Sequence, residues 1–138
     1  MKWSKYILPL WLFSLSLLAD HVHWLGNYNT ALKLAYDQQK PLLVLLVKKG
    51  DIFSSTLIKK CFMNQPYIDK VNQKTVPVII IYESRLSYPI EMYYTTVFPT
   101  LFLVDTKTEM FMKEPLYGEQ ISQKVLLQYF QPSASKIK

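Results

Sequence analysis

The sequence is poor in the residues that metal and redox chemistry require. It contains one cysteine, Cys61, and two histidines, His21 and His23, in 138 residues. A single cysteine cannot form an intrachain disulfide, and a structural zinc site needs about four cysteine or histidine ligands. We therefore expect neither a metal site nor a cofactor. We expect the two histidines to lie on a flexible N-terminal segment. For Cys61 two interpretations remain: a buried, unreactive thiol, or a thiol that pairs with another molecule.

Charge and glycine are scarce as well. Asp, Glu, Lys and Arg make up 19% of the chain, apolar residues make up 50%, and there are 3 glycines. This composition excludes a disordered chain and supplies a core. The net charge is +6, but the lysines are spread along the chain, with Lys48-Lys49 and Lys59-Lys60 as the only adjacent pairs. We therefore expect a solvated basic surface and no nucleic-acid partner. Phosphate-binding loops, nucleophile elbows and paired catalytic carboxylates at a recognised spacing are also missing.

The N-terminus has the pattern of a signal peptide. Lys2 and Lys5 precede an apolar run from Ile7 to Leu18, and Ala19 is a small residue placed for cleavage. The run is shorter than the roughly 20 apolar residues of a membrane span, which favours a cleaved signal peptide. An uncleaved membrane anchor is the alternative. We predict a signal peptide at 1–19, a single domain at 20–131 and a polar tail at 132–138. The protein is then periplasmic or otherwise extracytoplasmic, with no stable membrane span after cleavage.

Apolar runs alternate with segments of helical spacing along the rest of the chain. The run at 41–47, PLLVLLV, is continuous and rich in branched residues, as in a strand that is buried on both faces. A parallel pair joined by a right-handed crossover and a later hairpin predict one mixed sheet with helices on both faces. The expected strands are Pro41–Val47, Thr75–Tyr82, Thr100–Val104 and Met110–Lys113. The expected helices are Tyr28–Gln39, Ser54–Met63, Tyr67–Gln73 and Glu119–Phe130, with a possible short helix at Ile90–Tyr94.

Two motifs on this order of elements resemble the thioredoxin-like family. One is Phe98-Pro99-Thr100 directly before a strand, and the other is the stretch that runs from Lys40-Pro41 to Val78. The resemblance covers about 24–130 and is to exported thioredoxin-like domains. It implies an α/β fold: a thioredoxin-like three-layer α/β/α sandwich around a central mixed sheet of about four to five strands. It also implies a cis peptide bond between Phe98 and Pro99.

The chain departs from this family at the redox motif. Aligned with it, the two cysteines of the CxxC motif fall on Asp51 and Ser54, and the preceding tryptophan falls on Gly50. Dithiol exchange needs a thiolate and a second, resolving sulfur, and neither residue supplies one. Aspartate before a helix is a good N-cap, so we expect Asp51 to be structural, with a catalytic carboxylate as the alternative. We expect no dithiol reductase or oxidase activity.

The resemblance also implies a binding groove that needs no sulfur. Family members bind extended segments between the loop before the first long helix and the loop that carries the cis proline. In this chain the implied groove residues are Ile52, Phe53, Phe98, Pro99, Tyr93 and Tyr94. The tyrosines, with Tyr88, could equally be a lid over the core. We expect a non-catalytic protein- or peptide-binding, or chaperone-like, domain that holds a segment of an envelope partner. A redox partner acting through Cys61 and a structural subunit of an envelope complex are the alternatives.

Overall fold

The elements follow the predicted order in a computed structural model, which describes residues 22–62, 68–82 and 88–130. The predicted signal peptide at 1–19 and the predicted polar tail at 132–138 lie outside these residues. The helices are α1 (Tyr28–Gln38), α2 (Ile52–Phe62), α3 (Ile68–Lys74) and α4 (Gln123–Tyr129), with a 3-10 turn η4 (Gly118–Gln120). The strands are β1 (Leu42–Val47), β2 (Val76–Ile81), β3 (Thr100–Asp105), β4 (Met110–Phe111) and β5 (Leu116–Tyr117). No helix within the described ranges is long and apolar enough to cross a membrane.

Several local predictions differ from the structure. The helix α2 begins at Ile52 and not at Ser54, and β4 ends at Phe111 and not at Lys113. The expected short helix at Ile90–Tyr94 is a series of turns. The expected last helix begins later, at Gln123, because Ile121 is extended after η4 and the Ser122 hydroxyl caps α4 by accepting a hydrogen bond from the Val125 amide. The strand β5 is not among the expected strands, because two residues are too few to show the alternation of apolar and polar side chains that is typical of a strand.

The sheet is mixed, and β1 lies at its centre. It pairs in parallel with β2 and antiparallel with β3, so that Leu45 lies opposite both Ile79 and Leu101. The two short strands both pair antiparallel with β3, β5 at its beginning and β4 at its end. On the outer side of β2, Leu25 adds a parallel bridge to Val78. The result is a five-stranded sheet with one interrupted edge.

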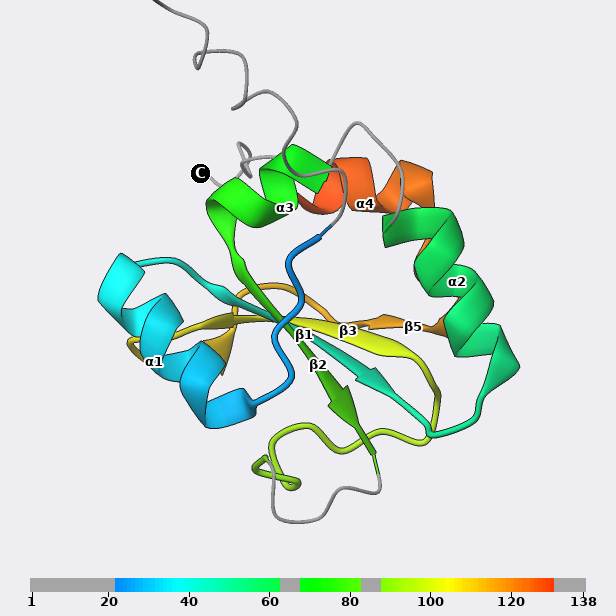
Figure 1. Cartoon of the computed structure of the whole chain (residues 1–138), viewed down its shortest axis with the longest axis horizontal. Coiled ribbons are helices and arrows are strands. Elements are labelled where there is room, and N and C mark those ends of the chain that lie inside the picture. The colour runs from blue at the N-terminus through cyan, green and yellow to red at the C-terminus, as the bar shows by residue number, and fades with distance from the viewer. Residues whose placement is uncertain (1–21, 63–67, 83–87, 131–138) are drawn as a thin grey trace, which may run out of the picture.

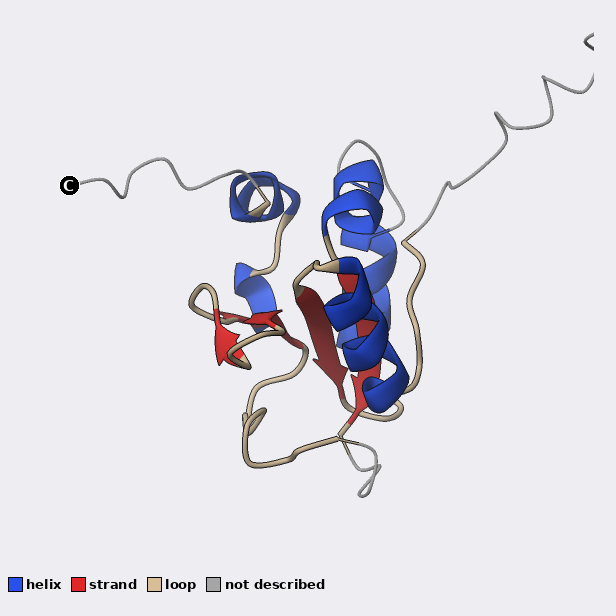
Figure 2. Cartoon of the chain, turned by 90° about the vertical axis from the view of Figure 1, so that its left-hand side faces the viewer, coloured by secondary structure: helices blue, strands red, loops and turns tan. Residues whose placement is uncertain are grey.

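Helices cover both faces of this sheet, with α1 on one side and α2, α3 and α4 on the other (Figures 1 and 2). Side chains alternate between the faces of a strand, and all six residues of β1 are buried. Leu43 and Leu45 therefore join the core beneath α2, α3 and α4, whereas Leu42 and Val44 join the core beneath α1. The continuous apolar run in the sequence is explained by these two separate cores.

Candidate functional site

The N-terminus of α2 holds the two residues that align with the redox cysteines. The Asp51 carboxylate accepts a hydrogen bond of 2.6 Å from the Ser54 hydroxyl. It also accepts from the backbone amides of Phe53 and Ser54, each at 3.3 Å. These contacts, the Ser54 hydroxyl first, lower the pKa of Asp51. Asp51 therefore caps the helix, and its carboxylate is hydrogen-bonded to Ser54, which is itself buried.

The first turn of α2 exposes two apolar side chains. Ile52 is 78% exposed and Phe53 is 42% exposed. Nothing in the capping geometry requires apolar residues at these positions, because the cap uses the Asp51 side chain and the backbone amides. Ile52 and Phe53, which we expected on the loop before α2, therefore lie in its first turn, and both are accessible to a partner.

The second loop of the predicted groove leads into β3, and its Phe98–Pro99 peptide bond is cis. Two threonine hydroxyls hold the loop: that of Thr95 accepts from the Val97 amide, and that of Thr100 donates to the Val97 carbonyl at 2.5 Å. Val97 is 43% exposed. Phe98 is half-buried, and its ring lies 4.9 Å from the Tyr82 ring, centroid to centroid.

The backbone of Phe98 is open to hydrogen bonding. Within the described part of the chain, neither its N–H nor its C=O has a hydrogen-bond partner. By contrast, the next carbonyl along, that of Pro99, accepts a bond of 2.8 Å from the Gly118 amide. A donor and an acceptor on one residue are what an added extended strand requires.

The aromatic residues before this loop divide between core and surface. Tyr93, which we expected in the groove, is 1% exposed, and its hydroxyl lies 2.8 Å from the hydroxyl of Tyr28. Its ring packs edge-on against Phe102 at 5.0 Å. The groove prediction is therefore wrong for Tyr93, which fills the core beneath α1 together with Tyr88. Tyr94 is 68% exposed.

The lone thiol lies far along α2. Cys61 is 3% exposed, and its Sγ lies 3.7 Å from the Ile121 carbonyl, to which it donates. Burial raises the pKa of the thiol, against a smaller lowering by Lys60. A thiol with a raised pKa is a poor nucleophile at neutral pH. Of the two interpretations of Cys61, these contacts favour the unreactive one.

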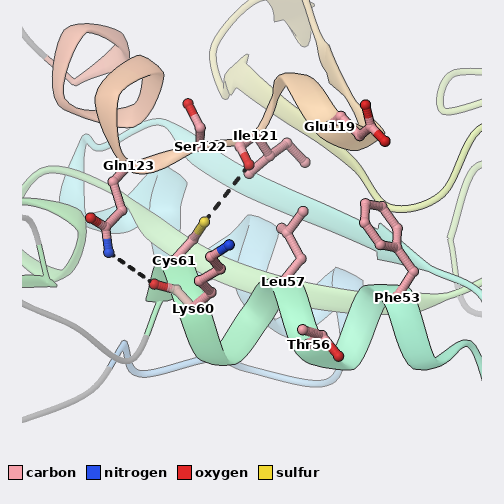
Figure 3. A pocket seen from close by; sticks show the side chains of 9 residues that line it. All are labelled: Phe53, Thr56, Leu57, Lys60, Cys61, Glu119, Ile121, Ser122 and Gln123. Atoms are coloured by element: carbon pink, nitrogen blue, oxygen red, sulfur yellow. Dashed lines mark hydrogen bonds between the residues drawn. The ribbon is translucent and has the colours of Figure 1, made fainter.

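A pocket of about 360 Å³ opens between α2 and the segment that enters α4 (Figure 3). The Gln123 side chain spans the two sides, donating to the Lys60 carbonyl at 3.1 Å. The pocket is lined by Phe53, Thr56, Leu57, Lys60, Cys61, Glu119, Ile121, Ser122 and Gln123. Sequence reasoning missed it, because its walls are about 60 residues apart in the chain and neither carries a motif.

The pocket adjoins the predicted groove at two points. Phe53 belongs to both. On the opposite wall, Glu119 follows Gly118, whose amide bonds to the Pro99 carbonyl. Gly118 has a φ of +55°, and a Cβ at this position would lie 3.2 Å from Val97 Cγ1, so glycine permits this close approach. The described ranges contain no group of three His, Cys, Asp or Glu residues that could hold a metal ion.

Known proteins resemble this chain in structure and not in sequence. No protein-family model matches the sequence, and no curated protein matches it. Among solved structures, a DsbH oxidoreductase matches with a TM-score of 0.62 and 13% identity, over 80% of this chain and 83% of that one. A thioredoxin from Thermus thermophilus matches with a TM-score of 0.63 and 14% identity, over 80% and 85%. The predicted fold class is confirmed: the chain has a thioredoxin-like fold.

Proposed function

We propose that this thioredoxin-fold protein is an exported, non-catalytic domain that binds an extended peptide segment of another envelope protein. One observation carries the proposal. At the helix end where redox members of the fold hold two sulfurs, Asp51 and Ser54 form a hydrogen-bonded cap, and the side chains between them, Ile52 and Phe53, remain apolar and exposed. Asp51 and Ser54 thus occupy the positions of the redox cysteines with a structural role, whereas Ile52 and Phe53 offer an apolar contact surface.

Binding would use the backbone of the cis-proline loop, together with side chains from that loop and from the first turn of α2. The N–H and C=O of Phe98, which have no partner among the described residues, would pair with the backbone of the segment, as an added strand does. Ile52, Phe53 and Val97 would contact its side chains. One short strand buries much less than the roughly 1,200 Å² of a stable interface, so the affinity would be weak to moderate.

The proposal of export is supported by the signal-peptide pattern of the first 19 residues, and an exported domain would meet its partner outside the cytoplasm. Intact-mass measurement of the protein recovered from cells tests this part. A mature chain that begins at Asp20 is the expected result. A full-length chain recovered with the cytoplasmic fraction would contradict it.

The binding proposal is tested with a matched pair of double variants. Ile52→Ser/Phe53→Ser removes the exposed apolar side chains of the groove. The control variant Leu34→Ser/Tyr36→Ser removes two apolar side chains from the exposed face of α1, outside the groove. Leu34 is 38% exposed and Tyr36 is 59% exposed. Peptides selected from a random display library against the unaltered domain serve as probes. We expect the first variant to lose about tenfold in affinity and the second to lose nothing.

Equal affinity of the folded groove variant and the unaltered domain would eliminate this groove. That result would favour a purely structural subunit. The other alternative, a redox partner acting through Cys61, is less well supported, because the thiol is buried and its pKa is raised.

A further inference from the structure

The pocket beside α2 carries opposite charges at its two ends. The Lys60 side chain lies at the end next to Cys61 and Gln123, and Glu119 lies at the other end, beside Phe53 (Figure 3). Both residues are exposed. In the part of the chain that the structure describes, neither has an ion-pair partner. The two charges are therefore available to a ligand, and they give the pocket a direction.

Between the two charges the pocket is apolar. Leu57, Cys61 and Ile121 are 7%, 3% and 2% exposed, so their side chains form its floor. Two polar side chains that line the pocket already have hydrogen-bond partners in the protein. The Ser122 hydroxyl accepts from the Val125 amide, and the Gln123 side chain donates to the Lys60 carbonyl. A volume of about 360 Å³ is at the small end for ligand pockets. It has room for an apolar side chain together with the flanking parts of a peptide.

We infer that this pocket is the side-chain subsite of the groove, and that it selects a segment in which an apolar residue lies between an acidic and a basic residue. The acidic side chain pairs with Lys60, the apolar one enters between Leu57 and Ile121, and the basic one pairs with Glu119. In an extended chain, side chains on one face are two residues apart. The selected segment therefore carries an acidic and a basic residue, each two positions from the apolar one, and it is bound in one of the two possible orders and not in the other.

The inference rests on the proposed function and makes it specific. Its link to the groove is the shared Phe53 side chain and the bond from the Gly118 amide to the Pro99 carbonyl, next to Glu119. A segment paired with Phe98 thus runs past the pocket mouth. Rim charges of this kind set the orientation of a ligand more than its total affinity.

Two peptides of identical composition test the direction. They are Ser-Lys-Ser-Leu-Ser-Glu-Ser and Ser-Glu-Ser-Leu-Ser-Lys-Ser, each blocked at both ends and titrated into the isotope-labelled mature domain by NMR. We expect a preference of about fivefold for one of them, the size that two exposed ion pairs support. The double charge swap Lys60→Glu/Glu119→Lys should invert that preference. The control swap Lys70→Glu/Glu114→Lys uses exposed residues outside the pocket and should leave it unchanged.

The outcomes separate the two proposals. Equal affinity for the two peptides, with binding that is lost in Ile52→Ser/Phe53→Ser, would overturn the charge-directed pocket and leave the groove in place. A preference that persists through the Lys60/Glu119 swap would also overturn the pocket. Absence of binding of either peptide would overturn the charge-directed pocket, whereas the groove is decided separately by the peptides selected from the display library. Higher salt should reduce the preference of the unaltered domain, because exposed ion pairs are screened.

Discussion

The hydroxyl pair of Tyr28 and Tyr93 gives a sharp test of the core beneath α1. The two oxygens lie 2.8 Å apart, and the side chains are 2% and 1% exposed. Tyr93→Phe keeps the ring and its edge-on contacts with Tyr28 and Phe102. It removes one hydroxyl and leaves the other buried without a partner.

A buried hydroxyl without a partner costs about 1–3 kcal/mol. We therefore expect Tyr93→Phe to lower the free energy of unfolding by about 1–2 kcal/mol. For a domain of this size each kcal/mol lowers Tm by roughly 3–5 °C. Tyr28→Phe should behave in the same way. The double variant should be nearer to the unaltered protein than the sum of the single losses, because no hydroxyl is then left unpaired, with a coupling energy of about 1 kcal/mol.

Urea denaturation followed by circular dichroism measures all four proteins of this cycle. Peptide binding to Tyr93→Phe should be unchanged, since Tyr93 does not reach the groove surface. Single losses that add fully in the double variant would refute the hydroxyl pair. Reduced binding without reduced stability would show that Tyr93 contacts the ligand after all.

Three further outcomes are expected. Cys61 should react with Ellman's reagent at least about 100-fold more slowly in the native protein than in denaturant, because burial raises its pKa and blocks access; equal rates would contradict the buried thiol. The protein should not catalyse insulin reduction, and catalysis that Cys61→Ser abolishes would make the thiol functional. The pKa of Asp51 is lowered in the folded state, so its stabilising effect is complete above the ordinary carboxyl pKa of about 3.9 and is lost as the pH falls from there through the lower folded-state value. The stability difference between the unaltered protein and Asp51→Asn should therefore shrink across that acidic window, and a constant difference would refute the cap.

The sequence allowed the central strands to be predicted, because each is long, apolar and covered on both faces. The position of β1 within 41–47 follows from a run of six buried residues. The Asp51 cap could be predicted for a similar reason, since an aspartate at a helix start bonds to amides within three residues. Local patterns of this kind are complete within one stretch of sequence.

The remaining features depend on contacts between distant segments. Tyr93 carries no local sign of burial, because its hydroxyl finds a partner 65 residues away in Tyr28. The pocket is likewise formed by α2 and a segment near α4. Lys60 and Glu119 line the same pocket only because these two segments pack together. The short strand β5 exists because β3 supplies its partner. Contacts between distant segments cannot be predicted from the hydrophobic periodicity or the secondary-structure propensity of either segment.

The two-sided core has a consequence for how this protein can change over evolutionary time. The pocket and its apolar floor belong to the face that α2, α3 and α4 cover, whereas α1 and the Tyr28–Tyr93 pair belong to the other face. Substitutions that share no partner and lie more than about 7–10 Å apart have additive effects on stability. Substitutions in the pocket-bearing face can therefore change the lining of the pocket, while the opposite face stabilises the domain independently.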